Sequence, residues 1–335
     1  MVAEKKSERV RTVQVNVPGV DVLTEQIKDK ARNGNFREAE LLREQLLESN
    51  PMALDSIISS AEVIEAEKTK QLDTDHISTW SDLYDELSTE EINCLFYSLK
   101  RVRVETGKLL FVQGQPNNRL FFIESGGVTL FYRKGQKNYP VIKLSTGDIL
   151  GEDSFFGISL CPFSAATQSE VNVYYLNRKI ADDWRDDRAG LYAKIAEFCE
   201  KHGVGEKTAE QKSSGRRDYR RYPLRGSITA YLLDQQRKRT TTYFKGELSD
   251  VSRSGVCFSI HCSRQQIARN LLARDTDIAL VFHDQDDKTV ELSGTIVKLS
   301  YHLHNDYSVH LKFSEILTID LFKSFPCDWS AEEKF

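Results

Sequence analysis

Two short polar segments in the C-terminal third of the chain carry residues that could bind a phosphate-bearing guanine nucleotide. The first holds four arginines within residues 216–221, among them Arg216, Arg217 and Arg221. A guanidinium is a planar fork of donors that matches phosphate oxygens and can bond the O6 and N7 atoms of guanine. It also stacks on flat rings. Taken alone, such a run is more often a solvated linker or an unspecific nucleic-acid patch than a ligand site.

The second segment follows about thirty residues later and has the form Asp-x-Ser-x-x-Gly. It contains Asp250, Ser252 and Gly255 and falls between two β-rich runs. An aspartate accepts hydrogen bonds from the N1–H and N2–H donors of guanine, which an arginine cannot do. A glycine in such a turn permits a positive φ and a close approach of ligand. The two segments therefore have complementary chemistry, one cationic and one able to accept from guanine.

The order, spacing and β context of the two segments resemble the PilZ family, whose signature is Arg-x-x-x-Arg followed by Asp/Asn-x-Ser-x-x-Gly. The resemblance extends over about residues 214–326. It implies a six-stranded β-barrel that binds cyclic di-GMP, with the arginine arm on the phosphates and guanines. The residues carried over as ligand-binding are Arg216, Arg217, Arg221, Asp250, Ser252 and Gly255. His310 stands where the family often has glycine, which bears on strand packing more than on the ligand.

A second resemblance covers about residues 91–202, where short β-rich runs separated by glycines are followed by a helical pattern. The runs 111–116, 120–126 and 144–152 resemble the cyclic nucleotide-binding domain of catabolite activator proteins and kinase regulatory subunits. In that family a phosphate cassette runs from a Gly-Glu pair to an arginine before a Ser/Thr-Ala pair. Gly151 and Glu152 fit the near end, where the glutamate would bind the ribose 2′-OH, and Ser164 and Ala165 fit the far end.

This cassette lacks the family's arginine. Phe163 occupies the position before Ser164, and Asp148 and Asp153 add negative charge beside the Gly-Glu pair. A charge-assisted bond to the phosphate is worth about 1.5–3 kcal/mol, so its loss weakens binding about tenfold to a hundredfold. The sequence therefore favours a folded platform over a cAMP or cGMP sensor, and a dual receptor that also binds cAMP or cGMP here is the alternative.

Residues 21–87 have helical periodicity, set by apolar residues such as Ala39, Leu41, Leu42, Leu46 and Leu47. Residues 34–51 resemble one tetratricopeptide unit, but stable arrays need about three, so a plain helical hairpin is favoured. Ser88 and Glu91 have the spacing of a capping box. The apolar face of the helices needs a partner in this chain or in a second copy, which leaves a homodimer open.

The 335 residues are 40% hydrophobic and 29% charged, with a net charge of −4. This balance gives the whole molecule no strong attraction to nucleic acid or anionic membrane. There is no apolar run of about 20 residues and no signal-peptide core, so a cytoplasmic protein without membrane insertion is expected. The six cysteines and seven histidines show no metal spacing, and no catalytic motif is present. Neither an enzyme nor a metal or other cofactor is expected.

The predicted architecture is multidomain α+β. It comprises a disordered tail (1–20), a helical region (21–87), a cyclic-nucleotide-binding-type β-barrel with flanking helices (88–202), a polar linker (203–215), a six-stranded PilZ barrel (216–326) and a second tail (327–335). The PilZ-like block occupies the place of the winged helix of catabolite activators, so specific DNA binding is not expected.

The function predicted from these features is that of a bacterial second-messenger receptor. Cyclic di-GMP would order the linker, alter how the two barrels sit and so change the surface offered to a downstream protein, which the sequence does not identify. The alternatives are the dual receptor, an interaction scaffold with idle nucleotide sites, and unspecific nucleic-acid binding. Steep salt dependence without guanine preference would indicate the last.

Overall fold

The computed structural model describes residues 19–204, 219–263, 265–272, 274–281, 289–302 and 306–327. Most of both expected tails and most of the linker lie outside these residues, as do Arg216 and Arg217. The chain divides into two compact units. The first contains the described residues up to Ser78 together with Leu87–Tyr97, and the second contains Thr79–Glu86 and the described residues from Ser98 onward.

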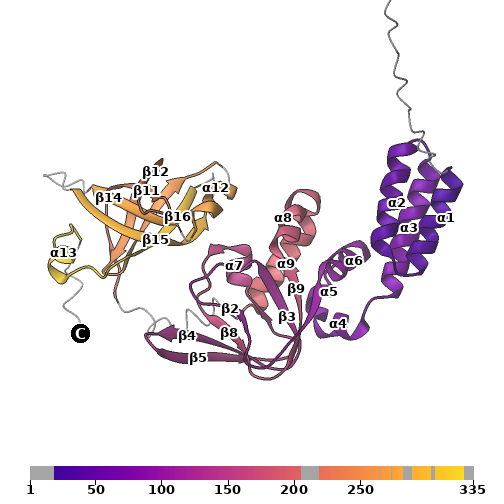
Figure 1. Cartoon of the computed structure of the whole chain (residues 1–335), viewed down its shortest axis with the longest axis horizontal. Coiled ribbons are helices and arrows are strands. Elements are labelled where there is room, and N and C mark those ends of the chain that lie inside the picture. Colours follow the sequence, from indigo (N-terminus) through magenta and orange to yellow (C-terminus); the bar gives the residue numbers. More distant parts are fainter. Residues whose placement is uncertain are drawn as a thin grey trace, which may run out of the picture. The chain divides into compact units, whose positions relative to one another are not determined.

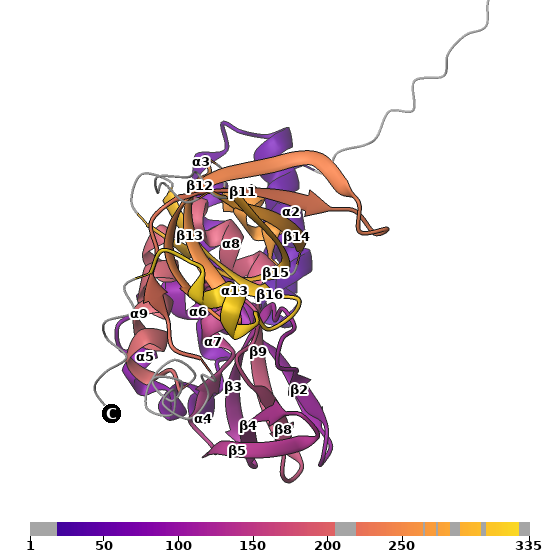
Figure 2. The same ribbon diagram turned by 90° about the vertical axis from the view of Figure 1, so that its left-hand side faces the viewer.

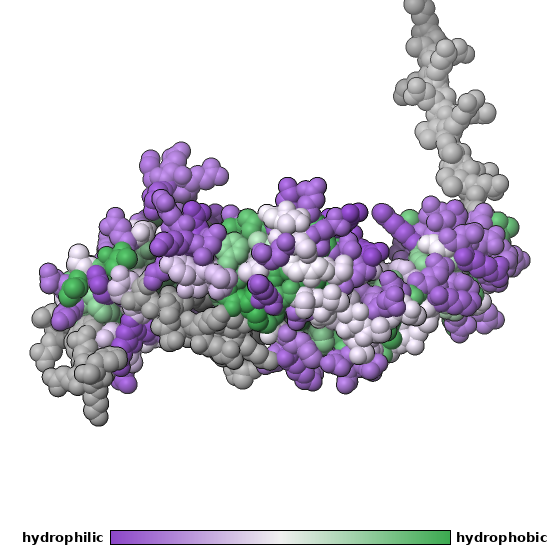
Figure 3. Space-filling model, turned by 90° about the horizontal axis from the view of Figure 1, so that it is seen from below, coloured by the Kyte–Doolittle hydropathy of each residue, from purple (hydrophilic) through white to green (hydrophobic). Residues whose placement is uncertain are grey.

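The first unit is helical, as predicted. Its helices are α1 (Val20–Arg32), α2 (Phe36–Ser49), α3 (Leu54–Lys70), α4 (Thr74–Thr79) and α6 (Thr89–Ser98). Helices α1, α2 and α3 pack around a core that includes Leu23, Leu46 and Ile64 (Figure 1). The apolar face of α2 thus finds partners within the chain, although Leu41 is 56% exposed. The face of this unit in view in Figure 3 is mostly hydrophilic.

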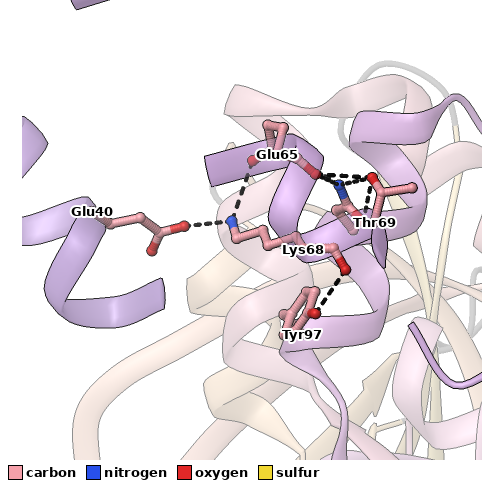
Figure 4. Close-up of polar contacts among 6 residues, drawn as sticks. Glu40, Glu65, Lys68, Thr69 and Tyr97 are labelled. Atoms are coloured by element: carbon pink, nitrogen blue, oxygen red, sulfur yellow. Dashed lines mark hydrogen bonds and ion pairs between the residues drawn. The ribbon is translucent and has the colours of Figure 1, made fainter. Parts of the chain in front are cut away.

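A buried lysine organises the polar contacts between helices of the first unit (Figure 4). Lys68 Nζ donates to Glu40 Oε1 at 2.5 Å and to Glu65 Oε1 at 3.2 Å. Tyr97 Oη donates to the Lys68 carbonyl at 2.8 Å, and Asn93 Nδ2 donates to Glu65 Oε2 at 2.9 Å. Burial alone would lower the pKa of Lys68, but its hydrogen bonds with Glu40 and Glu65 outweigh burial, and the pKa lies above its ordinary value. Lys68 is therefore a charged cross-link between α2 and α3.

The first β domain consists of two four-stranded sheets with helices, which confirms the predicted cyclic-nucleotide-binding-type architecture. One sheet has the strand order β1-β9-β3-β6 and the other β2-β8-β4-β5. The strands are β1 (Lys100–Val104), β2 (Leu109–Phe111), β3 (Arg119–Ser125), β4 (Val128–Lys134), β5 (Lys137–Leu144), β6 (Ile149–Leu150), β8 (Ser164–Thr167) and β9 (Val171–Asn177). The cassette contains α7 (Glu152–Phe156) and β7 (Ile158–Ser159), while α5 (Ser81–Tyr84), α8 (Arg178–Asp187) and α9 (Ala189–His202) complete the domain.

The second β domain is the predicted six-stranded closed barrel (Figure 2). Its strands are β11 (Ser227–Leu233), β12 (Arg239–Ser252), β13 (Gly255–His261), β14 (Asp275–Val281), β15 (Thr289–Tyr301) and β16 (Asp306–Phe313). All pair antiparallel, and the barrel closes because β12 pairs with both β11 and β13. Alternate residues such as Phe258, Leu280 and Val309 point into one core.

Three short elements accompany this barrel. They are β10 (Tyr222–Pro223), which adds to the edge of β12, α12 (Gln265–Leu271) and α13 (Ile319–Lys323). Phe322 of α13 packs against Tyr222 with ring centroids 5.8 Å apart, so the C-terminal helix covers the start of the barrel. Among the described parts of the chain, no helix is both long enough and apolar enough to cross a membrane.

Candidate functional site

Strand pairing holds the end of the arginine arm alongside the Asp-x-Ser-x-x-Gly segment. In the β10–β12 pairing, Tyr222 lies opposite Val251 and Pro223 lies opposite Asp250. Pro223 is tolerated because β10 is the outer strand of the sheet, where a missing N–H costs least. Arg221 therefore enters the sheet next to Asp250, and its Nη1 lies 3.4 Å from Asp250 Oδ1.

This ion pair is accessible to a ligand. The side chains of Arg221 and Asp250 are 42% and 30% exposed. An ion pair in contact with water is worth only about 0–1 kcal/mol, so opening it costs little. Two of the sequence-predicted residues are thus brought together in the described structure, while Arg216 and Arg217 of the same arm lie outside the described residues.

Ser252 and Gly255 form the turn that joins β12 to β13. Ser252 is 5% exposed, its Oγ accepts from the Ser254 N–H at 3.3 Å, and it donates to the Gly255 carbonyl at 3.3 Å. The expected reason for the glycine, a positive φ, is wrong, since Gly255 is not among the glycines with positive φ. A Cβ at Gly255 would instead lie 2.5 Å from the Leu311 carbonyl of β16. The glycine is required because two strands approach closely, and Ser252 shapes the turn.

Two residues of this site went unrecognised in the sequence. The Arg253 guanidinium lies 4.9 Å from the ring centroid of Tyr219, in a cation–π contact between the turn and the arm. Arg253 Nε also donates to the Leu317 carbonyl at 2.9 Å. The available signals were an aromatic residue within the arm and an arginine between the two serines of the turn, but only the folded barrel brings them together.

Cys257 lies beside the ion pair, opposite Asp250 in the β12–β13 ladder. It is 5% exposed. Burial and the negative charge of Asp250 raise the pKa of Cys257 to about 11, against the opposing effect of Arg221. The thiol is therefore neutral at physiological pH, and the charged groups identified at this position are Arg221 and Asp250.

The near end of the first domain's cassette is tightly built. Gly151 has φ +92, and a Cβ there would lie 2.7 Å from the Arg119 carbonyl, so only glycine fits. Glu152 is 8% exposed, and its Oε1 lies 2.8 Å from where a Cβ at Gly203 would be. Burial and the charge of Glu152 raise the pKa of Cys199 well above its ordinary value. The carboxylate thus lies against the end of α9.

The far end of the cassette is filled by Phe163. This side chain is 3% exposed and belongs to the core of the first β domain. Ser164 is 5% exposed and its Oγ accepts from the Gln113 N–H at 2.9 Å, while Ala165 is fully buried. The cavity here, lined by Glu152 and Phe163 among others, measures about 20 Å³. That volume holds about one water, whereas small-molecule pockets have roughly 300–1,000 Å³.

Among the residues that the structure describes, the remaining titratable side chains form no further candidate centre. Within the described ranges, no group of three or more His, Cys, Asp or Glu side chains could hold a metal ion. His302 Nε2 lies 2.7 Å from Ser308 Oγ, and His304, considered with it in the sequence, is outside the described residues.

Comparisons with known proteins identify both β domains. Residues 101–185 match the family model of the cyclic nucleotide-binding domain, and residues 215–322 match that of the PilZ domain. The CRP-like cAMP-activated global transcriptional regulator of Mycobacterium tuberculosis is 29% identical over 123 residues, which cover 36% of this chain and 54% of that protein. The chain thus spans about half the length of the curated relative it matches.

Solved structures similar to this chain include two bacterial examples. A cyclic nucleotide-binding-like protein from Brucella abortus is 23% identical with a TM-score of 0.30, covering 32% of this chain and 94% of that chain. A cyclic nucleotide-binding domain from Methylobacillus flagellatus is 15% identical with a TM-score of 0.37, covering 42% of this chain and 83% of that chain. From the two family matches, the chain carries two binding-type domains, a cyclic nucleotide-binding domain over residues 101–185 and a C-terminal PilZ domain over residues 215–322.

Proposed function

We propose that this chain is a second-messenger receptor that binds cyclic di-GMP beside the Arg221–Asp250 pair of its PilZ domain. The observation that carries the proposal is the β10–β12 pairing, which sets a guanidinium 3.4 Å from a carboxylate at an accessible strand junction. Arg221 would leave Asp250 to bond a phosphate or the O6 and N7 atoms of guanine, while Asp250 accepts from N1–H and N2–H. Arg216 and Arg217 would add positive charge, and Ser252 and Gly255 would fix the turn.

Calorimetric titration of cyclic di-GMP into the full chain tests this proposal. Arg221→Ala and Asp250→Ala each remove a charged hydrogen-bonding group, so each is expected to weaken binding about tenfold to a hundredfold. The matched control is Arg239→Ala. Arg239 is also a half-exposed arginine paired with a carboxylate, at 3.1 Å from Asp277 Oδ2, but it lies at the opposite end of β12. Wild-type affinity in the Arg221→Ala and Asp250→Ala variants would contradict the proposal.

Guanine preference separates this function from unspecific binding through the arginine arm. Cyclic di-AMP carries the same two phosphates but lacks the N1–H and N2–H groups from which Asp250 would accept hydrogen bonds. We expect cyclic di-AMP to bind much more weakly than cyclic di-GMP. We also expect Asp250→Ala to weaken the binding of cyclic di-GMP more than that of cyclic di-AMP. Equal affinities that fall steeply with salt would instead indicate nonspecific binding of polyanions.

The linker between the two β domains is the segment through which ligand binding would change their relative arrangement. Val204, at the start of the linker, packs against the core of the first β domain, and Tyr219, after the linker, contacts Arg253. Cyclic di-GMP held by Arg216, Arg217 and Arg221 would restrict the segment between these two anchors, and so bias how the two barrels sit. Hydrogen exchange over residues 205–218 should then slow on addition of cyclic di-GMP, and unchanged exchange at saturation would contradict this relay.

The first β domain would serve as a folded platform. Phe163 takes the place of a phosphate-binding arginine, and the cavity of about 20 Å³ beside it is far below the size of a nucleotide pocket. Titration with cAMP and cGMP is expected to give no saturable heat in wild type. Heat from cAMP that disappears in Glu152→Ala would support the dual receptor instead.

A further inference from the structure

A strand of the cyclic nucleotide-binding domain is paired with the PilZ barrel. Strand β7 lies within the cassette, between α7 and Phe163. It runs antiparallel to β15, with Ser159 opposite Lys298 and Ile158 opposite Leu299. The Leu160 N–H, just after β7, donates to the Val297 carbonyl at 3.0 Å. The cassette therefore contributes an additional strand to the sheet that forms the barrel.

The geometry of β15 explains why a strand can be added at this place. Strand β14 covers β15 only as far as Thr295, so the edge of β15 beyond that residue lacks a β14 partner. Val297 is also the extra residue of a bulge between Ile296 and Lys298 in the pairing with β16. An uncovered edge exposes N–H and C=O groups that another strand can pair with. Here β7 and Leu160 take up those groups.

Ile158 extends the contact into the barrel core. It is 4% exposed and belongs to the same hydrophobic cluster as Leu299 and the other core residues of the PilZ barrel. Burial of apolar surface is the force that holds the barrel's own strands together, and Ile158 contributes to it from another domain. The pairing thus combines backbone hydrogen bonds with a buried side chain.

One cross-strand row leads from this pairing to the proposed ligand site. The row runs from Ser159 to Lys298, His310, Cys257 and finally Asp250, each opposite the next in adjacent strands. Residues that face one another in this way share one side of the sheet and interact as neighbours. Four steps of about 4.8 Å make this path around the barrel roughly 19 Å long. These pairings form one contiguous connection between the cassette and Asp250.

We propose that β7 is a detachable edge strand that links the conformation of the cassette to occupancy of the strand-junction site in the PilZ domain. The identity of the ligand rests on the proposed function. Any ligand that binds better when β7 is paired must strengthen the pairing, and one that binds better when β7 is released must weaken it, because linkage is reciprocal. With only two residue pairs in β7, the pairing is short enough to be made and broken while both domains stay folded.

The pairing is tested without ligand by hydrogen exchange in the full chain. Ile158→Ala removes the side chain from the PilZ core, and Leu160→Pro removes the N–H that reaches Val297. Both variants are expected to speed exchange over residues 297–299 at least tenfold while β11 stays protected. The control Ile123→Ala, a fully buried residue of the first domain's own core, should leave residues 297–299 unchanged. Wild-type exchange over 297–299 in both Ile158→Ala and Leu160→Pro would overturn the proposal.

The linkage is tested by titrating cyclic di-GMP into the same proteins. Ile158→Ala and Leu160→Pro are expected to change the Kd at least fivefold relative to wild type, the lower end of typical coupling between sites. Cyclic di-GMP should also alter exchange over residues 158–160 in wild type. Equal affinity in all variants with unchanged exchange at 158–160 would refute the linkage and leave the proposed function standing. If wild type does not bind cyclic di-GMP at all, the proposed function itself fails, and with it the linkage.

Discussion

Arg221 and Asp250 neutralise each other across the β10–β12 pairing, with Nη1 and Oδ1 3.4 Å apart. The two groups that should bind cyclic di-GMP are therefore each other's partners in the free protein. Under the proposed function, ligand binding would exchange this accessible ion pair for contacts from each partner to phosphate or guanine, and the cost of opening it is about 0–1 kcal/mol. These two members of the proposed site already lie together in the structure without ligand.

Conservative substitution of Asp250 should separate its charge from its role as an acceptor. Asp250→Asn keeps one side-chain oxygen able to accept from guanine and also frees Arg221, so cyclic di-GMP should bind within about threefold of wild type. Asp250→Ala removes both acceptor oxygens and should bind about tenfold to a hundredfold more weakly. Calorimetric titration of the two variants side by side decides the point, and an equal loss in both would count against an acceptor role.

The contact between Tyr219 and Arg253 should assist binding by restraining the arm. A cation–π contact at an exposed site is worth about 0.5–1 kcal/mol, so Tyr219→Leu should weaken cyclic di-GMP binding roughly twofold to fivefold. Tyr219→Phe keeps the ring over Arg253 and serves as the matched control, with affinity close to wild type. Equal weakening by Phe and Leu would assign the effect to the hydroxyl instead of the ring.

Gly255 should be intolerant of even a methyl group. A Cβ at this position would lie 2.5 Å from the Leu311 carbonyl, which belongs to the backbone of β16 and cannot move aside cheaply. Gly255→Ala is expected to lower the free energy of unfolding of the PilZ barrel by about 1–3 kcal/mol. Gly127→Ala is the control, because the nearest atoms to its added Cβ are 3.9 Å away. Thermal unfolding of both variants measures the difference.

Lys68 should stabilise the helical unit while it is charged. Lys68→Met leaves Glu40 and Glu65 without their shared cation. It should lower the free energy of unfolding, measured in urea, by about 1–3 kcal/mol. Because the pKa of Lys68 is raised by folding, this stabilisation is complete below the unfolded pKa of about 10.4 and is lost as the pH rises through the folded pKa. Lys70→Met removes an exposed lysine whose side chain is 66% accessible, and it should change stability by at most about 0.5 kcal/mol.

Cys257 should make the PilZ barrel sensitive to alkaline pH. Burial and the charge of Asp250 raise the pKa of Cys257 to about 11, so the unfolded chain releases this proton at lower pH than the folded protein does. Its contribution to stability is complete below the unfolded pKa of about 8.5 and is lost as the pH rises to about 11. Between these two pH values, the free energy of unfolding measured in urea should fall less in Cys257→Ala than in wild type. The same dependence of this free energy on pH in both proteins would contradict the assignment.

Local features of this protein were determined by the sequence. The Ser88–Glu91 capping box forms as predicted, with the Ser88 N–H donating to Glu91 Oε2 at 2.8 Å and the Glu91 N–H to Ser88 Oγ at 3.3 Å. The β-rich runs around residues 120–126 and 256–260 form strands, and each contains consecutive buried residues. Caps, turns and strand periodicity depend on residues near one another in the chain, and the two family motifs can therefore be read from the sequence.

Tertiary structure decided how distant segments meet. Gly255 is required because the backbone of β16 passes close to it. Phe163 is buried in the core of the first β domain. Arg253 contacts Tyr219 only once β10 has paired with β12. The pairing of Ser159 with Lys298 depends on an edge that β14 leaves uncovered when the barrel closes. Such contacts are fixed by strand order, register and closure of the whole sheet, none of which is a property of neighbouring residues in sequence.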